Sequence, residues 1–534
     1  MRPLSRRAAV VTAVTAAVAT VLSPTLAPVA GAQPAPVAGA QPAPAADAPM
    51  SRAVASGWTA VSGPVDSTTT PAFLRGSVPS QDPTPVLRLF WPQRDTDGTW
   101  SIRGRIVITG GGAGASTTVL SGWHDLNTRV AAVNSACGQP GTWRQRLLFA
   151  GNRTTDTTDP LSQGVVYGAD SDGGESWSVD STGSYSYTRQ AVSTYGLGAA
   201  ETDACDRVLA AFTGSSSTHA SFHVGPEAGI PAPTEDGATA DTGSGVRNVT
   251  VGVSSPGISV WVVWSSFGSS AAEAGVHAQK VLPSLGPVLT APGSAQADGT
   301  VSLDGQPVGV ASAADGSLWV AYRDAPNSKA VRLWQAGSST ARIIPGAYDV
   351  QHVTLTSSAS GVLWAAIVDA AGTRANPSIR ALRIRGGCTT PRAVPVPAIK
   401  GKYTNVWQIG AAPQTRGSAR VPGAAGEALH LWLNASIGSD DRLWYASVLP
   451  SLNASVTTKP SPLRAGKKGL VTVKVTETCL PMNGVKVGFL GKLVTTNSSG
   501  VATFSVPKST AKGVYTLVAS ASGYESDVVQ IRVR

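Results

Sequence analysis

Between about Trp58 and Leu452 the chain repeats one pattern, an apolar segment that carries tryptophan, a polar turn, and a second segment in which polar and apolar residues alternate. The clearest copies are "ISVWVVW" with "GVHAQKVLP", "SLWVAYRD" with "AVRLWQAG", "VLWAAIVD" with "SIRALRIRGG", and "ALHLWLNA" with "RLWYASVLP". Alternation with a period of two residues is typical of β-strands, and a polar turn between two such runs predicts an antiparallel hairpin. The repetition predicts an architecture built from recurring units of β-sheet.

The spacing of the repeat indicates the size of each unit. Markers on the strand that we expect to be innermost lie 36 to 68 residues apart, around the roughly 40–55 residues that a four-stranded propeller blade requires. These markers are Leu89, Val130, Val166, Leu209, Trp261, Trp319, Trp364 and Trp432. The 58 glycines, the 37 prolines and a charged fraction of 14% also favour many short strands and turns. We therefore predict an all-β fold with a β-propeller of seven blades over residues 55–452, and six or eight blades remain alternatives.

The N-terminal residues predict export. Three arginines precede an apolar run from Ala8 to Leu22, and small-residue cleavage sites follow, which is the pattern of a secretory signal peptide. The run is short for a membrane span, and no second run of membrane length follows. We expect residues 1–32 to be a signal peptide and 33–54 an Ala/Pro-rich spacer. The mature protein is then secreted, extracellular or associated with the cell wall, and Ser5-Arg6-Arg7 leaves twin-arginine export open beside general secretion.

The cysteine and histidine content favours disulfides over metal. None of the cysteines forms a Cys-x-x-Cys pair, and their even number in an exported chain favours disulfide bonds. Three pairings of Cys137, Cys205, Cys388 and Cys479 exist. We prefer the sequential pairing, in which the Cys388–Cys479 bond fastens the last domain to the one before it. His219 and His223 would share one face of a strand and could bind metal with a third ligand, but ordinary strand histidines are the simpler interpretation, and we predict no metal and no cofactor.

The net charge of the chain is concentrated near its C-terminus. Residues 453–534 contain 11 Lys and Arg against three carboxylates, whereas residues 33–452 contain 28 cationic and 29 anionic side chains. A basic surface attracts wall polymers and lipid head groups, although lysines spread over all faces would give the same count. We expect partners among cell-wall or extracellular glycans, no nucleic-acid partner, and a monomer.

Residues 453–534 resemble a bacterial Ig-like domain. The likeness lies in "GVKVGFLGKLVTTNSSGVATFSVPKSTAKGVYTLVASASGYESDVVQIRV", where runs that alternate with period two are joined by turn residues. The resemblance implies a β-sandwich that acts as a spacer or adhesion unit without chemistry of its own.

The stretch "DSDGGESW" resembles the Asp-box of sialidase-type propellers. The matching residues are Asp172, Gly174, Ser176 and Trp177, while Asp170 replaces the leading hydroxyl residue. An aspartate can accept backbone N–H groups in a tight turn, a glycine provides a turn conformation closed to other residues, and a tryptophan anchors the hairpin. In that family the box lies at hairpin tips distant from the active site. The resemblance therefore implies a structural turn, with Trp177 buried at the periphery and Asp172 accepting backbone hydrogen bonds.

No catalytic residue follows from this resemblance. The early Arg-x-Pro signature of sialidases is absent, since Arg420-Val421-Pro422 follows the Asp-box instead of preceding it. No Gly-x-Ser-x-Gly elbow, His-Glu-x-x-His helix or phosphate loop is present in the sequence. The sequence favours a non-catalytic protein, and a glycoside hydrolase or lyase of propeller architecture remains an alternative.

Tryptophans are the remaining candidates for ligand binding, because exposed indole rings are common platforms for sugars. Those within strand patterns, such as Trp364 and Trp432, are expected to pack between blades. The tryptophans next to turn residues are expected to be exposed and to bind ligand, and these are Trp58, Trp123 with its neighbour His124, and Trp407. We predict a secreted, non-catalytic binding or scaffold protein of the bacterial cell envelope. Alternatives are a propeller-type carbohydrate-active enzyme and an adhesin-like protein-binding component.

Overall fold

The structure is a computed structural model, and the statements below concern the residues that it describes. These are 57–76, 86–107, 113–135, 144–155, 165–172, 177–179, 192–201, 207–214, 220–226, 235–239, 246–254, 259–266, 274–294, 308–313, 315–324, 330–345, 350–358, 361–369, 378–388, 390–397, 403–413, 427–437 and 440–534. Every regular element among them is a β-strand, so the predicted all-β class is confirmed. No helix in this part of the chain is long and apolar enough to cross a membrane.

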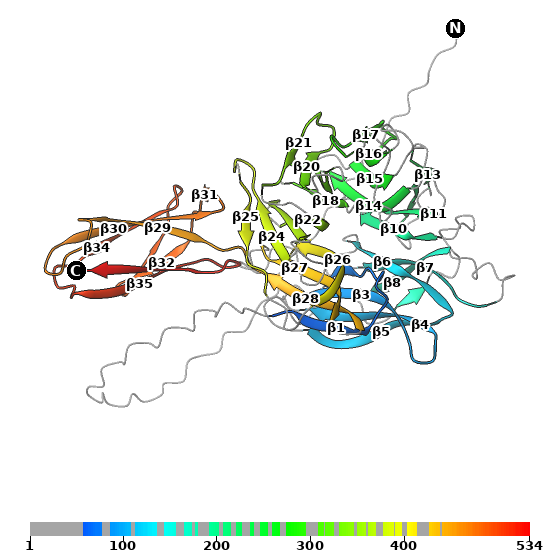
Figure 1. Ribbon diagram of the computed structural model, residues 1–534, viewed down its shortest axis with the longest axis horizontal. Coiled ribbons are helices and arrows are strands. Elements are labelled where there is room, and N and C mark those ends of the chain that lie inside the picture. The colour runs from blue at the N-terminus through cyan, green and yellow to red at the C-terminus, as the bar shows by residue number, and fades with distance from the viewer. Residues whose placement is uncertain are drawn as a thin grey trace, which may run out of the picture. The chain divides into compact units, whose positions relative to one another are not determined.

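Up to Val448 the described strands fall into sets of four antiparallel strands that follow one another along the chain, and a single parallel bridge between Gly196 and Val249 joins two of these sets into one eight-stranded sheet (Figure 1). Six of them pair their strands in chain order. Their strands are β2 (Ala72–Gly76), β3 (Val86–Arg94), β4 (Trp100–Val107) and β5 (Ala113–Trp123); β6 (Asp125–Ser135), β7 (Arg144–Asn152), β8 (Val165–Asp172) and β9 (Ser178–Val179); β10 (Val192–Glu201), β11 (Arg207–Gly214), β12 (Ser221–Pro226) and β13 (Glu235–Ala238); β14 (Val246–Ser254), β15 (Ser259–Ser266), β16 (Gly275–Leu282) and β17 (Val288–Thr290); β18 (Val308–Ser312), β19 (Leu318–Arg323), β20 (Val331–Gln335) and β21 (Ala341–Ile343); β22 (Val350–Ser357), β23 (Leu363–Asp369), β24 (Ser378–Ile384) and β25 (Arg392–Val394).

The seventh sheet combines both ends of this region. It contains β26 (Tyr403–Pro413), β27 (Leu429–Ile437), β28 (Asp440–Val448) and, as its outer strand, β1 (Thr59–Pro64). Figure 1 shows β1, in blue, beside β28, in orange. A buried apolar cluster that includes Val61, Trp91 and Tyr445 joins this last sheet to the first one. The N-terminal strand therefore completes the series of sheets.

The first strand of each sheet packs against the first strand of the next sheet. The contact becomes a parallel bridge between Gly196 and Val249, and Thr70, which precedes β2, forms a second parallel bridge with Arg129 of β6. The first strands are therefore the inner strands, and apolar clusters fill the space between the sheets behind them. Sheets of four strands arranged around an axis in this way form a β-propeller.

The tryptophan markers of the repeat lie on the second strands, so the expectation that they mark the innermost strand is wrong. Trp261, Trp319, Trp364 and Trp432 lie in β15, β19, β23 and β27. The second strand is enclosed by both neighbouring sheets, and every residue of β23 is buried, which explains its strong apolar signal. The predicted burial of Trp364 and Trp432 is confirmed, at 0% and 6% exposure. Val130 and Val166 fall in one sheet, which is why eight markers correspond to seven sets of four strands among the described residues.

The inner strands approach each other so closely that some positions admit only glycine. A Cβ atom added to Gly309 of β18 would lie 2.3 Å from the backbone nitrogen of Leu355 in β22, and one added to Gly198 of β10 would lie 2.8 Å from the backbone nitrogen of Val251 in β14. Real Cβ atoms do not approach backbone atoms at such distances. Glycine at these positions therefore sets the spacing of neighbouring sheets.

Replacing Gly309 with alanine is expected to lower the free energy of unfolding by roughly 1–3 kcal/mol, because the sheets of β18 and β22 must separate to admit the methyl group. Gly57→Ala is the matched control, since a Cβ atom at Gly57 would meet nothing within 4 Å. Chemical denaturation of both variants measures the difference. Equal stabilities would show that the inner strands can separate at no cost.

Residues from Asn453 onward form a β-sandwich of two antiparallel sheets. One sheet contains β29 (Asn453–Lys459), β30 (Gly469–Glu477), β31 (Leu480–Pro481) and β34 (Val501–Val506), and the other contains β32 (Lys486–Phe489), β33 (Lys492–Thr495), β35 (Gly513–Ser520) and β36 (Asp527–Val533). Alternate residues of both sheets, such as Val473 and Leu517, point into one shared core. The period-two pattern seen in the sequence thus corresponds to the inner and outer faces of these strands.

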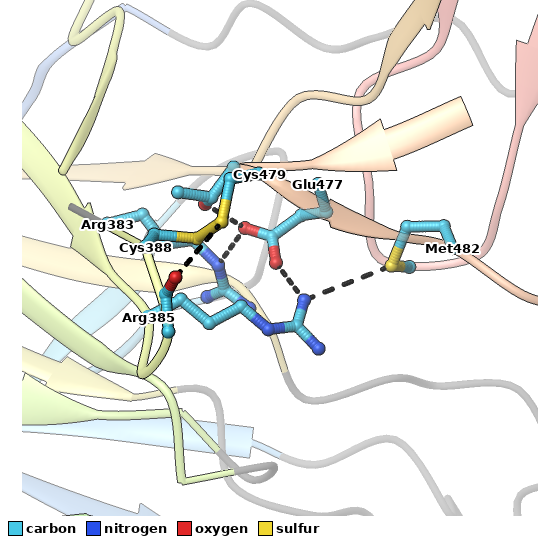
Figure 2. Close-up of a disulfide and its surroundings, with 8 residues drawn as sticks. Arg383, Arg385, Cys388, Glu477, Cys479 and Met482 are labelled. Carbon is cyan, nitrogen blue, oxygen red and sulfur yellow. Dashed lines mark hydrogen bonds and ion pairs between the residues drawn. A yellow bond between two sulfur atoms is a disulfide. The ribbon is translucent and has the colours of Figure 1, made fainter. Parts of the chain in front are cut away.

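A disulfide and a buried ion cluster fasten the sandwich to the propeller (Figure 2). Cys388, which follows β24, is bonded to Cys479, which follows β30, with 5.8 Å between their Cα atoms. This bond is the one that the preferred pairing expects, and Cys137 and Cys205 lie outside the described residues. We call the bond, together with Arg383, Arg385, Glu427 and Glu477, the latch.

Arg383 is the centre of the latch. Its guanidinium donates to Glu477 across 2.6 Å and also to Glu427, and it lies 4.9 Å from the ring centre of Trp364. Arg383 and Glu477 are each only 1% exposed. Burial acts to raise the pKa of Glu477, but Arg383 and Arg385 outweigh it and hold that pKa below its usual value. The latch therefore contains buried charges that depend on one another.

Candidate functional site

Five of the described inner strands share one irregularity, a shift of register within the half of the strand where the chain enters the sheet. The shifts lie between Leu126 and Val130 in β6, Val192 and Leu197 in β10, Arg247 and Thr250 in β14, Val350 and His352 in β22, and at two places between Tyr403 and Gln408 in β26. Bulges of this kind redirect side chains and are frequent at the rims of closed sheets and beside functional sites. Five inner strands place such bulges at one end of the propeller, which we call the bulge end.

Connectivity decides which loops share the bulge end. Consecutive strands within a sheet are antiparallel, so the connections between second and third strands lie at the same end as the starts of the inner strands. The connections between third and fourth strands lie at the opposite end. Asp170 and Asp172 belong to β8, a third strand, and Trp177 precedes β9, a fourth strand. The Asp-box stretch therefore lies away from the bulge end.

The Asp-box residues can be followed only in part. Trp177 is half-buried and packs edge-on against Phe90 of the preceding sheet, with ring centres 5.4 Å apart. Gly174 and Ser176, and the side chains of Asp170 and Asp172, lie outside the described residues. The hydrogen-bonding role of Asp172 therefore stays a prediction.

The turn chemistry expected of Asp172 is present in two other turns. Asp97 accepts hydrogen bonds from the backbone nitrogen of Thr99 at 2.9 Å and from its hydroxyl at 2.7 Å. Asp315 accepts the same two bonds from Ser317, at 2.9 and 2.5 Å. These hydrogen bonds lower the pKa of both carboxyl groups. Aspartate-capped turns are thus a recurrent device of the propeller.

Trp407 presents an indole ring at the bulge end. It lies in β26 at the second register shift, and 38% of its surface is exposed. Its Nε1 donates to the Ser436 hydroxyl at 3.0 Å and to the Asp441 carboxylate at 2.8 Å. Ser436 also donates to Asp441. The predicted exposure of Trp407 is confirmed, and its polar edge is held while part of the ring faces solvent.

Polar groups from two sheets and from the segment between them meet at Gln408, the residue that follows this tryptophan in β26. Gln408 donates to the carbonyl of Thr68 at 3.3 Å and accepts from the hydroxyl of Thr70. The hydroxyl of Thr68 bonds that of Thr128 in β6 at 2.9 Å. The segment 66–70 thus bridges the inner strands of the last sheet and of the second sheet.

A buried asparagine fixes this segment. Asn434 of β27 is 0% exposed, and its Nδ2 lies 3.0–3.1 Å from the carbonyl oxygens of Asp66, Ser67 and Thr69. Asp66 in turn accepts from the backbone nitrogen of Thr68 at 2.8 Å. The Asn434 side chain therefore fixes the backbone of the segment that carries Thr68 and Thr70.

Arg129 of β6 follows Thr128 in the chain and brings a cationic residue next to this cluster. Its backbone is bridged to that of Thr70, which precedes β2. Burial lowers the pKa of Arg129 to about 10, so the guanidinium stays cationic at neutral pH. We call the cluster of Thr68, Thr70, Arg129, Trp407 and Gln408 the bulge-end site. It combines an exposed indole, hydroxyls, an amide and one cation.

Three carboxylates at the bulge end are engaged by arginines of their own sheets. Each pair joins a second strand or the turn after it to a third strand. The pairs are Asp95 with Arg103, Asp324 with Arg332 at 2.9 Å, and Asp369 with Arg380 at 2.5 Å. Each of these ion pairs stiffens the hairpin of its own sheet.

The other residues expected to bind ligand do not join this site. Trp58 is 9% exposed and donates to the carbonyl of Pro397 at 2.7 Å, and Trp123 is 2% exposed and packs edge-on against Phe149. Their predicted exposure is wrong, because both rings lie in the cores between sheets instead of following their polar neighbours into solvent. His124 is exposed. No described contact joins Trp58, Trp123 or His124 to Trp407.

The histidine pair is also only partly described. His219 and the side chain of His223 lie outside the described residues. Within the part that is described, no group of three His, Cys, Asp or Glu side chains is arranged to hold a metal ion.

Comparisons with known proteins report the following likenesses. No protein-family model matches the sequence, and no curated protein matches it. Similar solved structures include AofleA from Arthrobotrys oligospora, at 10% identity over 72% of this chain and 89% of that chain, with a TM-score of 0.35. An Aleuria aurantia lectin in complex with alpha-methyl-L-fucoside follows at 12% identity, 72% and 96% coverage and a TM-score of 0.32. A Penicillium chrysogenum alpha-L-arabinanase complexed with arabinobiose matches at 11% identity, 61% and 93% coverage and a TM-score of 0.35.

Proposed function

We propose that the chain is a secreted, non-catalytic glycan-binding protein of the bacterial cell envelope. In this proposal the seven four-stranded sheets are the blades of a closed propeller, the bulge-end site holds the glycan, and an Ig-like sandwich forms a basic, envelope-facing spacer. The observation that carries the proposal is Trp407, an exposed indole whose Nε1 is held by Ser436 and Asp441 at the bulge end.

The chemistry of the bulge-end site suits a sugar. A pyranose has an apolar face that stacks on an indole ring and hydroxyl groups that require both donors and acceptors. Thr68, Thr70 and Gln408 provide hydroxyl and amide groups, and Arg129 provides a cation. Because Trp407 and the segment 66–70 are held by existing hydrogen bonds, binding would order few additional side chains.

The proposed location outside the cytoplasm has chemical support in the latch. A disulfide persists in an oxidising compartment, and the structure contains the Cys388–Cys479 bond. The signal-like N-terminal sequence and the basic C-terminal segment point to the same environment.

Replacing Trp407 with alanine is expected to weaken glycan binding roughly 10- to 100-fold, because a ring that anchors an interface carries a large share of the binding energy. The ligand would first be found with the mature chain on an array of fucosides, arabinosides and peptidoglycan fragments. Titration calorimetry would then compare Trp407→Ala with the control Leu285→Ala, which alters an exposed apolar side chain between a third and a fourth strand, at the end opposite the bulge end.

Equal affinities of the two variants would place the glycan elsewhere and overturn the bulge-end site. Release of reducing sugar from a bound glycan would overturn the non-catalytic part of the proposal and favour the hydrolase alternative.

A further inference from the structure

The strand ends of the sandwich separate its charged residues into two groups. Lys459 ends β29 beside Leu470, Val506 ends β34 beside Gly469, and Val533 of β36 pairs with Gly513. Val533 is also bridged to Leu463. The loops 460–468 and 507–512 and the last residues of the chain therefore lie at one end of the sandwich (Figure 1, where C marks this end). We call this end the basic tip.

Eight of the 11 cations of residues 453–534 belong to the basic tip, and all eight are exposed. They are Lys459, Arg464, Lys467, Lys468, Lys508, Lys512, Arg532 and Arg534. The three carboxylates of the segment lie at the other end. Glu477 belongs to the latch, Asp527 accepts from the backbone nitrogen of Ala454 at 2.6 Å, and Glu525 bonds through its backbone to Pro450. No carboxylate of the described chain forms an ion pair with the eight tip cations.

A surface that only confers solubility would mix charges of both signs. The basic tip instead holds eight cations at one end of the sandwich, whereas the three Asp and Glu side chains lie at its other end, where Glu477 pairs with Arg383 and Arg385. We propose that the basic tip binds a linear phosphate-bearing polymer of the envelope. Lysine and arginine both bind phosphate oxygens, lysine as a point charge and arginine through paired donors. The inference rests on the proposed envelope-facing role of the sandwich, and it is independent of the glycan site.

The side chains of the tip favour a polymer over a lipid surface. Peripheral membrane binding requires large apolar side chains that enter the bilayer beside the cations. In the loop 460–468 the one large aliphatic side chain, Leu463, is 2% exposed. The exposed Leu470 and Val514 lie on the outer faces of opposite sheets, so they do not form one continuous apolar patch.

The test compares two triple variants of the mature chain with equal changes in net charge. The tip variant carries Lys467→Gln, Lys468→Gln and Lys512→Gln. The control carries Lys474→Gln, Lys486→Gln and Lys492→Gln, which are sandwich lysines outside the basic tip. Binding to immobilised linear polyphosphate would be measured from low to high salt, with phosphatidylglycerol vesicles and polygalacturonate as parallel probes.

We expect the parent chain to bind polyphosphate with an affinity that falls steeply with salt. The tip variant should lose about tenfold or more at low salt, and its slope of log affinity against log salt should be shallower by about two, because three phosphate contacts are lost. The control variant should change by less than about threefold. Equal losses in both variants, absent or salt-independent binding, or tighter binding to vesicles or polygalacturonate than to polyphosphate would overturn the proposal.

The experiment also separates this inference from the proposed function. Trp407→Ala should leave polyphosphate binding unchanged, and the tip variant should leave glycan binding unchanged. Polyphosphate binding without any glycan binding would disprove only the function proposed for the propeller. Glycan binding without any polyphosphate binding would disprove only the role proposed for the basic tip.

Discussion

Replacing Glu477 with glutamine is expected to lower the free energy of unfolding by roughly 3–5 kcal/mol, because Arg383 then loses one of the two carboxylates that compensate its buried charge. Arg383 and Glu477 are both 1% exposed, and 2.6 Å separates their nearest polar atoms. Water cannot replace the lost partner at such a depth. Calorimetry of the parent and variant chains, with the disulfide intact, would measure the loss.

The exposed ion pair of Arg442 with Asp440 is the matched control. It spans 3.2 Å, and its side chains are 41% and 45% exposed, so Asp440→Asn should cost less than about 1 kcal/mol. A triple variant with Arg383→Met, Glu427→Gln and Glu477→Gln should recover part of the loss, because no unpaired guanidinium remains buried. Similar losses in Glu477→Gln and Asp440→Asn would show that the latch contributes no more than a surface pair.

The stability of the propeller is expected to fall as the pH drops from about 6.5 to about 4, because His430 must then be protonated. Burial lowers the pKa of His430 from 6.5 to about 4. In that interval the unfolded chain binds a proton that the folded chain excludes, so acid favours unfolding. A shift of this size corresponds to roughly 3 kcal/mol between the two ends of the interval.

Denaturation at a series of pH values would compare the parent with His430→Gln. The variant should lose most of this pH dependence, whatever its absolute stability, while His124→Gln, which alters an exposed histidine, should keep it. His430 is 2% exposed, stacks on Tyr445 and bonds its hydroxyl at 2.7 Å, so some loss at neutral pH is also expected. An unchanged pH profile in His430→Gln would contradict the burial of a neutral imidazole.

The all-β fold and its repeating sheets were predictable because second strands such as β15 and β23 are enclosed on both faces. Enclosure selects continuous apolar residues, and a tryptophan in five of the described second strands (β3, β15, β19, β23 and β27) marks the repeat. The inner strands carry no comparable signal. Gly309 and the bulges of β14 and β26 interrupt the alternation of polar and apolar residues in the inner strands. The sequence pattern therefore located the second strands, and the prediction that these are the inner strands was wrong.

The bulge-end site was predictable only at Trp407. Whether an aromatic side chain is exposed depends on which residues of the folded chain pack over it. The polarity of its neighbours in the sequence does not predict that packing. Trp58 and Trp123 have polar neighbours as well, yet their rings turn into the cores between sheets. Thr68, Thr70 and Gln408 meet through sheet closure, which joins residues that are far apart in the chain. Only the "DSTTTP" stretch, rich in turn residues, could have drawn attention to this segment.

The pairing of β1 with β28 imposes an order on how the protein is built. The strand Thr59–Pro64 comes first in the propeller, and the strand Asp440–Val448 that receives it comes last. Their sheet stays incomplete, with an unpaired edge on each strand, until the whole intervening chain has been synthesised. The latch forms later still in synthesis, because Glu477 and Cys479 follow Val448. A chain whose synthesis stops before residue 440 would therefore leave β1 without a partner strand. The pairing of β1 with β28 can form only in chains that have been synthesised through β28.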